Sequence, residues 1–276
     1  MLEYLQYDFF VRALLAVLLI SISTGIIGTY IISRRLASIC GGITHACFGG
    51  LGLGYFLGLN PLVMAGVFAL ASSAGVEYTS QQFRLRRDSA IAVIWALGMA
   101  LGILFVFLTP GYVPELNSFL FGNILTVTRG DLIAYAIFAA ITLLFTIWQY
   151  RNIVAVAFDR DFAAVTGLPV RFISYAMTTL VAICIVLTIR AVGIMMLMSV
   201  LSIPIISAET WSHRFSSLML TSSLISAGCC IIGLMLSTII DVPASVLIVL
   251  TMVGAFALCR IFHALSLDYF TKKIAQ

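Results

Sequence analysis

Apolar runs long enough to cross a lipid bilayer recur from one end of this chain to the other. A helix needs about 20 apolar residues to cross the hydrocarbon layer. Inside that layer every backbone polar group must find its partner within the protein, so such runs fold as membrane helices. We place them at Phe10–Ser33, His45–Leu59, Pro61–Tyr78, Ser89–Thr109, Asp131–Gln149, Phe172–Arg190, Val192–Ala208, Leu218–Ile239 and Ala244–His263.

The composition excludes a water-soluble core. Hydrophobic residues make up 62% of the chain and charged residues only 9%, whereas soluble domains carry about 25% charged residues. No soluble domain interrupts the runs, and the six cysteines lie in or beside them, which is typical of reduced, buried thiols. We therefore expect an all-α, polytopic helical membrane protein in which residues 1–276 form a single transmembrane domain. Because the second run is short, we expect about eight to nine transmembrane helices.

The basic residues give the orientation of the chain in the membrane. If the second run crosses, most of them fall on one side, which the positive-inside rule places in the cytoplasm. Those on the cytoplasmic side are Arg34, Arg35, Arg84, Arg86, Arg87, Arg151, Arg160, Arg171, Arg214, Lys272 and Lys273. Since this charge is scattered over span ends, it does not indicate nucleic-acid binding. The loop Pro110–Gly130 then lies outside, and its apolar content predicts a helix over the outer mouth.

The polar segment Phe158–Pro169, between two apolar runs, predicts a short helix with both ends marked. Asp159 can cap the first turn, and Asp161 adds negative charge where the helix dipole favours it. Gly167 suits a left-handed residue after the last turn, and Pro169 blocks continuation. An isolated helix needs about 12–15 residues in water, so another body must hold this one. Spacing leaves two interpretations open: a docking surface for a soluble partner, or an elbow lying on the lipid headgroups.

His45 is the polar side chain that most suggests chemistry. It lies at the cytoplasmic end of the second run, with Gly41 one turn before it and Gly49 one turn after it, so its face of the helix is expected to be open. Ionisable groups at membrane depth are costly to bury and mark functional sites. Imidazole is also a common ligand of zinc-like metals. The other interpretation is a histidine that is hydrogen-bonded to a carbonyl at the membrane edge.

Small residues at four-residue spacing predict close contacts between helices, as at Gly50, Gly54 and Gly58. Glu77, near a cytoplasmic span end, is expected to be solvated. The methionines of the run Met195–Met198 are expected to fill the core. We find no nucleophile constellation, no phosphate-binding glycine loop and no zinc-protease motif, so we expect neither an enzyme nor an ATP site in this chain.

Four segments, in this order, resemble the permease subunits of ABC importers for zinc, manganese or iron. They are Arg34-Arg35 with Gly42–Ala46, Arg87–Ile91, Leu120–Leu125 and Phe158–Pro169. The similarity extends to Asp241-Val242-Pro243 and covers nearly the whole chain. It implies a homodimeric permease of the inner (plasma) membrane, with a divalent metal ion as substrate and no permanently bound cofactor. It also implies a cytoplasmic ATP-binding subunit, an extracytoplasmic metal-binding protein, and residues 159–167 as the helix that couples to the ATPase.

The resemblance also bears on the metal path. The family usually has an aspartate four residues before the histidine, where this chain has Gly41. His45 alone carries over, and the adjacent Cys40 is the candidate substitute ligand. Thiol and imidazole would favour zinc over manganese, which prefers oxygen. The alternatives are a permease for a metal chelate or cobalamin-like ligand, expected to have about ten spans, and an intramembrane hydrolase, whose paired catalytic groups Asp241 lacks.

Overall fold

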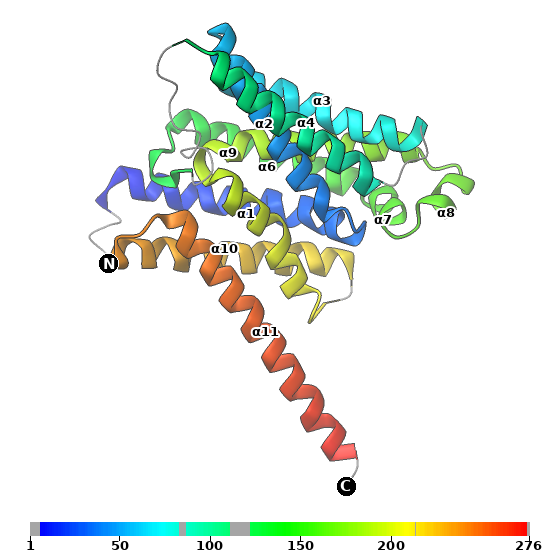
Figure 1. Ribbon diagram of the computed structural model, residues 1–276. Coiled ribbons are helices and arrows are strands. Elements are labelled where there is room, and N and C mark those ends of the chain that lie inside the picture. Colours follow the sequence, from blue (N-terminus) through cyan, green and yellow to red (C-terminus); the bar gives the residue numbers. More distant parts are fainter. Residues whose placement is uncertain (1–5, 83–86, 111–121, 213, 275–276) are drawn as a thin grey trace.

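The chain folds into a bundle of long helices (Figure 1). The computed structural model describes residues 6–82, 87–110, 122–212 and 214–274, and no strand occurs in these ranges. The elements are α1 (Asp8–Ser33), α2 (Ala37–Leu57), α3 (Pro61–Gln82), α4 (Arg87–Leu108), the 3-10 turn η2 (Ile124–Thr126), α6 (Arg129–Trp148), α7 (Tyr150–Phe158), α8 (Arg160–Val165), α9 (Val170–Ala208), α10 (Phe215–Ile240) and α11 (Ala244–Ile274). The expected all-α fold is confirmed.

Eight helical segments of the described chain are long and apolar enough to cross a membrane. They are α1, α3, α4, α6, the two arms of α9, α10 and α11. The 21-residue helix α2 is outside this set, because its glycines and His45 make it less apolar. It is nevertheless about 30 Å long at the usual rise per residue, and Figure 1 shows it lying along α4. The expectation of eight to nine membrane helices is therefore confirmed.

Helix α9 consists of two membrane arms joined at a sharp break. At the break, Gly193 has φ 76° and ψ 164°, a conformation open to glycine but rarely to other residues. The apolar segments that form the two arms are Val170–Ile189 and Ala191–Glu209, close to the predicted runs, and Gly193 is the third residue of the second segment. Gly122 of the outer loop packs against the backbone of Val192 and Gly193 so closely that an added Cβ would overlap it. The outer loop therefore closes over the break.

The described part of the outer loop does not contain the helix predicted over the outer mouth. Residues 111–121 lie outside the described ranges, and the next segment of the loop contains the short turn η2. The Leu125 N–H donates to Oδ1 of Asn123 (3.1 Å), which opens this turn. Ile124 and Val127 are buried against the bundle. The apolar content of this part of the loop therefore anchors an irregular segment, and no helix is needed to bury it.

The two ends of the bundle differ in charge. Figure 1 shows α7 and α8 at the same end as the α1–α2 connection, the C-terminal end of α3 and the start of α10. The residues Arg34, Arg35, Arg151, Arg160 and Arg214 belong to the segments at this end. The positive-inside rule favours the cytoplasm for this end, and we call it the cytoplasmic end.

Glycines bring α2 into close contact with α3. A Cβ at Gly54 would lie 2.6 Å from Cα of Pro61, and a Cβ at Gly50 would overlap the backbone of Met64. The ridge predicted from the four-residue spacing therefore packs within the chain at these two positions. Gly58 does not extend it. This glycine follows the last residue of α2 with φ 66°, and no atom lies within 4 Å of its Cβ position, so it caps the helix.

Helix α2 meets α4 in the same way on another face. Cβ atoms added at Gly98 and Gly102 would overlap the backbones of Ala46 and Phe48, respectively. Small residues at a helix crossing allow this backbone contact. The packing fixes α4 against α2 at the depth of His45, one residue from Ala46.

Candidate functional site

The imidazole of His45 is oriented by its own helix. Nδ1 lies 2.7 Å from the carbonyl oxygen of Gly41, one turn earlier on α2. A carbonyl only accepts hydrogen bonds, so Nδ1 carries the proton that it donates, which leaves Nε2 as the nitrogen that can offer a lone pair to a ligand. The histidine–carbonyl bond expected from one interpretation is therefore present, and it prepares the other nitrogen for a ligand. The side chain is partly exposed on the surface of a single chain.

Trp95 of α4 covers one face of this imidazole. The two rings stack with centroids 4.2 Å apart and planes 23° from parallel. Trp95 is itself 39% exposed, so the stacked pair lies at the edge of the single chain. The side of α2 that the glycine spacing predicted to be open is thus partly filled by an indole from another helix.

A third side chain, from the second arm of α9, completes this region. A Cβ at Gly41 would lie 2.9 Å from Cε of Met198 and 3.3 Å from Cζ3 of Trp95. We call His45, Trp95 and Met198, which meet around Gly41, the histidine sector. Met198 is partly exposed here, whereas Met196 is buried. Met195 is 57% exposed, so the expectation that the methionines of this run fill the core holds for Met196 and fails for Met195 and Met198.

Cys40 lies away from the histidine sector. Residues five apart on a helix point about 140° from each other, and Cys40 is fully buried. It lies near Cys184, another buried residue, on the first arm of α9. Within the described residues, no group of three or more His, Cys, Asp or Glu side chains is placed to hold a metal ion. At the histidine sector a single chain therefore offers one imidazole, and the described residues form no closed metal site there.

The short helix expected in Phe158–Pro169 is present as α8. The Phe162 N–H donates to Oδ1 of the capping residue Asp159 (2.9 Å). At the other end Gly167 is left-handed, with φ 78°. The N–H groups of Gly167 and Leu168 donate to the carbonyls of Ala164 (3.2 Å) and Ala163 (3.1 Å). This pair of hydrogen bonds is a Schellman motif, which stops the helix before α9 begins.

One face of α8 presents apolar side chains to the surroundings. Phe162 and Val165 of α8 are 65% and 87% exposed, and Phe158, the last residue of α7, is 66% exposed. Ala163, on the opposite face, is fully buried. Asp161 is exposed in the first turn, and Pro169 precedes the first residue of α9. An apolar surface bordered by a carboxylate is therefore available at the cytoplasmic end.

An ion pair ties α8 to the transmembrane bundle. Nη2 of Arg160 lies 3.3 Å from Oε1 of Glu77 on α3. The Glu77 side chain is only 1% exposed, so the expectation of a solvated carboxylate is wrong. Burying a carboxylate is costly unless it is paired, and Arg160 supplies that charge. The helix is thus held by a membrane helix as well as by its own caps.

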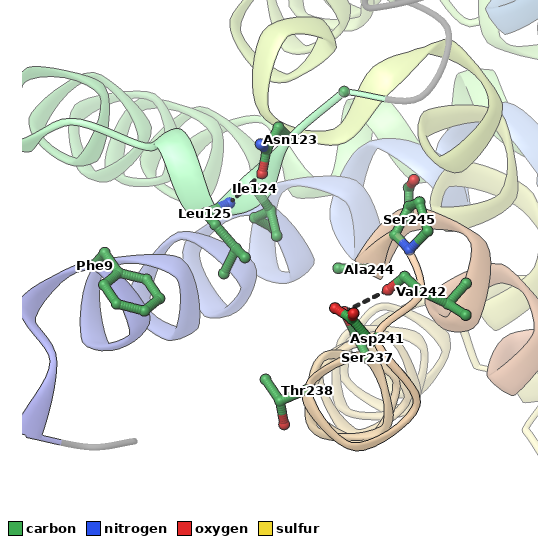
Figure 2. Close-up of a pocket in the computed structure, with 12 residues that line it drawn as sticks. Phe9, Asn123, Ile124, Leu125, Ser237, Thr238, Asp241, Val242, Ala244 and Ser245 are labelled. Atoms are coloured by element: carbon green, nitrogen blue, oxygen red, sulfur yellow. Dashed lines mark hydrogen bonds between the residues drawn. The ribbon is translucent and has the colours of Figure 1, made fainter. Parts of the chain in front are cut away.

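A separate hollow of about 690 Å³ opens at the extracytoplasmic end (Figure 2). Figure 2 shows Asn123 to Leu125 on one side and Ser237 with Asp241 on the other. Asp241 follows the last residue of α10 in a left-handed conformation. It is the one charged residue among those lining the hollow in the described chain. A single carboxylate is too few ligands for a tightly held metal ion.

The sequence pattern of the ABC 3 transport family matches residues 6–263. This chain belongs to the ABC 3 transport family. An uncharacterized membrane protein of Synechocystis sp. is 34% identical to it over 263 residues, which cover 95% of this chain and 94% of that protein. The manganese transport system membrane protein MntC of Halalkalibacterium halodurans is 31% identical, over 94% of this chain and 89% of that protein.

Solved structures agree with the family. The structure described as PsaBC from Streptococcus pneumoniae in complex with Fab matches with a TM-score of 0.81 and 27% identity. The match covers 93% of this chain and 94% of that one. The family predicted from four ordered segments is confirmed, and the protein is a multi-pass transport subunit of the membrane.

The sequence did not predict the contacts made by three residues, Trp95, Met198 and Glu77. Trp95 and Met198 lie on helices far along the chain from His45, and nothing in their spacing links them to it. Glu77 was noticed but expected to be exposed. The signal that could have found it is its place in an otherwise uncharged helix, because a carboxylate there needs a partner.

Proposed function

We propose that this protein is the permease subunit of an ABC importer that moves a divalent transition metal ion into the cytoplasm, and that His45 lies on the path. The observation that carries the proposal is the hydrogen bond from His45 Nδ1 to the Gly41 carbonyl, which leaves Nε2 as the ligand nitrogen of a partly exposed histidine in a membrane bundle. The name of the manganese transport relative supports the metal as substrate. The eight helices of the described chain that could cross a membrane are fewer than the number expected for a chelate permease.

Two copies of the chain would form the path between them. The histidine sector opens on the surface of one chain, which provides a single imidazole. Tight zinc sites use three or four protein ligands, whereas a transit point must release its ion. Two facing imidazoles completed by water satisfy that requirement. We therefore propose a homodimer whose central path passes the two histidine sectors.

The exposed apolar face of α8 is the proposed contact with a cytoplasmic ATP-binding subunit. The family membership supports such a partner, and Phe162 and Val165 provide apolar surface at the cytoplasmic end. Movement of α8 would reach α3 through Arg160 and Glu77. Because α3 packs on α2 at Gly50 and Gly54, the same movement would reach the helix that carries His45. An extracytoplasmic metal-binding protein would supply the ion at the other end.

Metal uptake by a His45→Ala variant tests this function. A deletion strain is complemented with wild-type or variant permease, and uptake of radioactive zinc and manganese is measured at limiting concentrations. We expect a loss of about tenfold or more, the scale seen when groups around a metal site are removed. His263→Ala is the matched control, because His263 lies far from α2 on α11 and contacts Trp211. Normal uptake by His45→Ala, at equal permease levels, would contradict the proposal.

A further inference from the structure

We propose that Met198 and Trp95 determine which metal ion passes His45, and that they favour zinc over manganese. This inference rests on the proposed function, because it requires the ion to pass the histidine sector. Met198 supplies a thioether and Trp95 an aromatic wall at the place where a side chain of residue 41 would otherwise lie. Neither residue was linked to His45 by the sequence.

The geometry brings three helices to one point. His45 is on α2, Trp95 on α4 and Met198 on the second arm of α9. The Met198 methyl carbon and the Trp95 ring lie 2.9 Å and 3.3 Å from the Cβ position of Gly41. Since Gly41 also accepts the hydrogen bond from His45, the Met198 methyl group and the imidazole both lie beside Gly41.

No carboxylate lies near this volume along the three helices. Residues 41–49, 91–99 and 194–202, about one turn either side of each member of the histidine sector, contain no Asp or Glu. The next acidic residue on α4 is Asp88, and its Oδ1 accepts a hydrogen bond from the Ser38 hydroxyl (2.8 Å) at the start of α2. Within these segments, the described contacts of the imidazole are the Gly41 carbonyl and the Trp95 ring, and the Met198 methyl carbon lies beside the Cβ position of Gly41.

The ligand preferences of zinc and manganese explain why this arrangement would select between the two ions. Manganese prefers carboxylate, carbonyl and water oxygen, whereas imidazole and sulfur ligands suit zinc. Manganese also stands at the weak end of the affinity order for nitrogen and sulfur sites. The indole stacked on one face of the imidazole occupies space that water would otherwise fill. An ion there exchanges water for a nitrogen ligand and a thioether, which favours zinc.

The test is the ratio of zinc to manganese uptake when both radioactive metals are supplied together to cells with the complete importer. The binding protein and the ATPase are common to all variants, so a change in the ratio reports the permease. Met198→Leu removes the sulfur at nearly constant volume. We expect it to lower the zinc-to-manganese ratio by about tenfold. Met195→Leu and Met196→Leu are matched controls, because one residue is 57% exposed and the other is buried in the core.

A second variant adds the missing oxygen ligand. Gly41→Asp combined with Met198→Ala opens space for a carboxylate beside His45, and we expect manganese uptake to rise relative to zinc.

Trp95→Phe keeps an aromatic ring against the imidazole, and it should change the zinc-to-manganese ratio less than Trp95→Ala does. An unchanged ratio in Met198→Leu, with His45→Ala inactive, would overturn this inference and leave the proposed function standing. Normal uptake by His45→Ala would overturn both.

Discussion

The cytoplasmic helix α8 and the histidine sector of α2 are held in place in opposite ways. α8 is fixed by its own Asp159 and Gly167 caps and by one ion pair, from Arg160 to Glu77. The histidine sector is fixed by side chains that three membrane helices bring together around Gly41. A bound partner can therefore displace α8 as a unit, whereas the histidine sector changes only when whole helices move.

Coupling between the two regions has a physical route. Glu77 sits in α3, and α3 contacts α2 backbone to backbone at Gly50 and Gly54. Close-packed contacts of this kind transmit displacement because they leave little room for adjustment. A change that breaks the caps of α8 should therefore affect transport differently from a change in the histidine sector.

The largest effect is expected from a substitution at Gly167, in the left-handed turn that ends α8. The experiment distinguishes the effect of backbone conformation from the effect of adding a side chain. Gly167→Val forces a branched residue into a left-handed turn, at a cost of roughly 1–2 kcal/mol. We expect uptake to fall about tenfold while ATP hydrolysis continues and membrane insertion is unchanged. Gly228→Val is the matched control. Both positions have no atom within 4 Å of the added Cβ, and only Gly167 has a positive φ. Equal, wild-type uptake in the two variants would show that the Gly167 cap is dispensable.

The sequence predicted α8 well and the histidine sector poorly, for the same physical reason. The caps of α8 are local, so Asp159, Gly167 and Pro169 could be recognised within a dozen residues. The long membrane helices were equally accessible, because apolar length alone specifies them. Trp95 and Met198 reach His45 only through the packing of α4 and α9 on α2. No local pattern carries that information.

The next effect tests the ion pair that joins the two regions. Glu77→Gln removes the charge that Arg160 meets, and a hydrogen bond to a charged group is worth roughly 1.5–3 kcal/mol. We expect uptake to fall about fivefold, with ATP hydrolysis less dependent on metal supply. Arg160→Gln alone should give a similar loss, and the double variant should lose no more than either single one. Strictly additive losses would show that the two side chains act independently.

A smaller effect is expected from the packing between α2 and α3. Gly54→Leu places a side chain against Pro61, whose Cα lies 2.6 Å from the Cβ position. Overpacking of this kind typically costs about 1–3 kcal/mol, so we expect a lower melting temperature of the purified permease and reduced transport. Gly66→Ala on α3 is the control, because its Cβ would meet Val186 at an ordinary 3.5 Å. If Gly54→Leu melts with the wild type, the contact does not constrain α2.

The smallest effect is expected at Cys40. This thiol is buried and points away from the histidine sector. Replacing it by serine changes core packing without removing a group beside His45. We expect Cys40→Ser to keep uptake within about twofold of the wild type, the range of substitutions of similar volume. A loss as large as that of His45→Ala would make Cys40 part of the metal path.

The most direct test measures metal uptake and ATP hydrolysis together in vesicles containing the complete importer. His45→Ala and Gly167→Val are compared with the wild type under limiting metal. We predict that His45→Ala lowers uptake by about tenfold or more with the ATPase subunit still bound, and that Gly167→Val lowers uptake by about tenfold while hydrolysis continues. Full uptake by His45→Ala, with the histidine removed from every copy, would contradict the claim that the metal ion passes this residue.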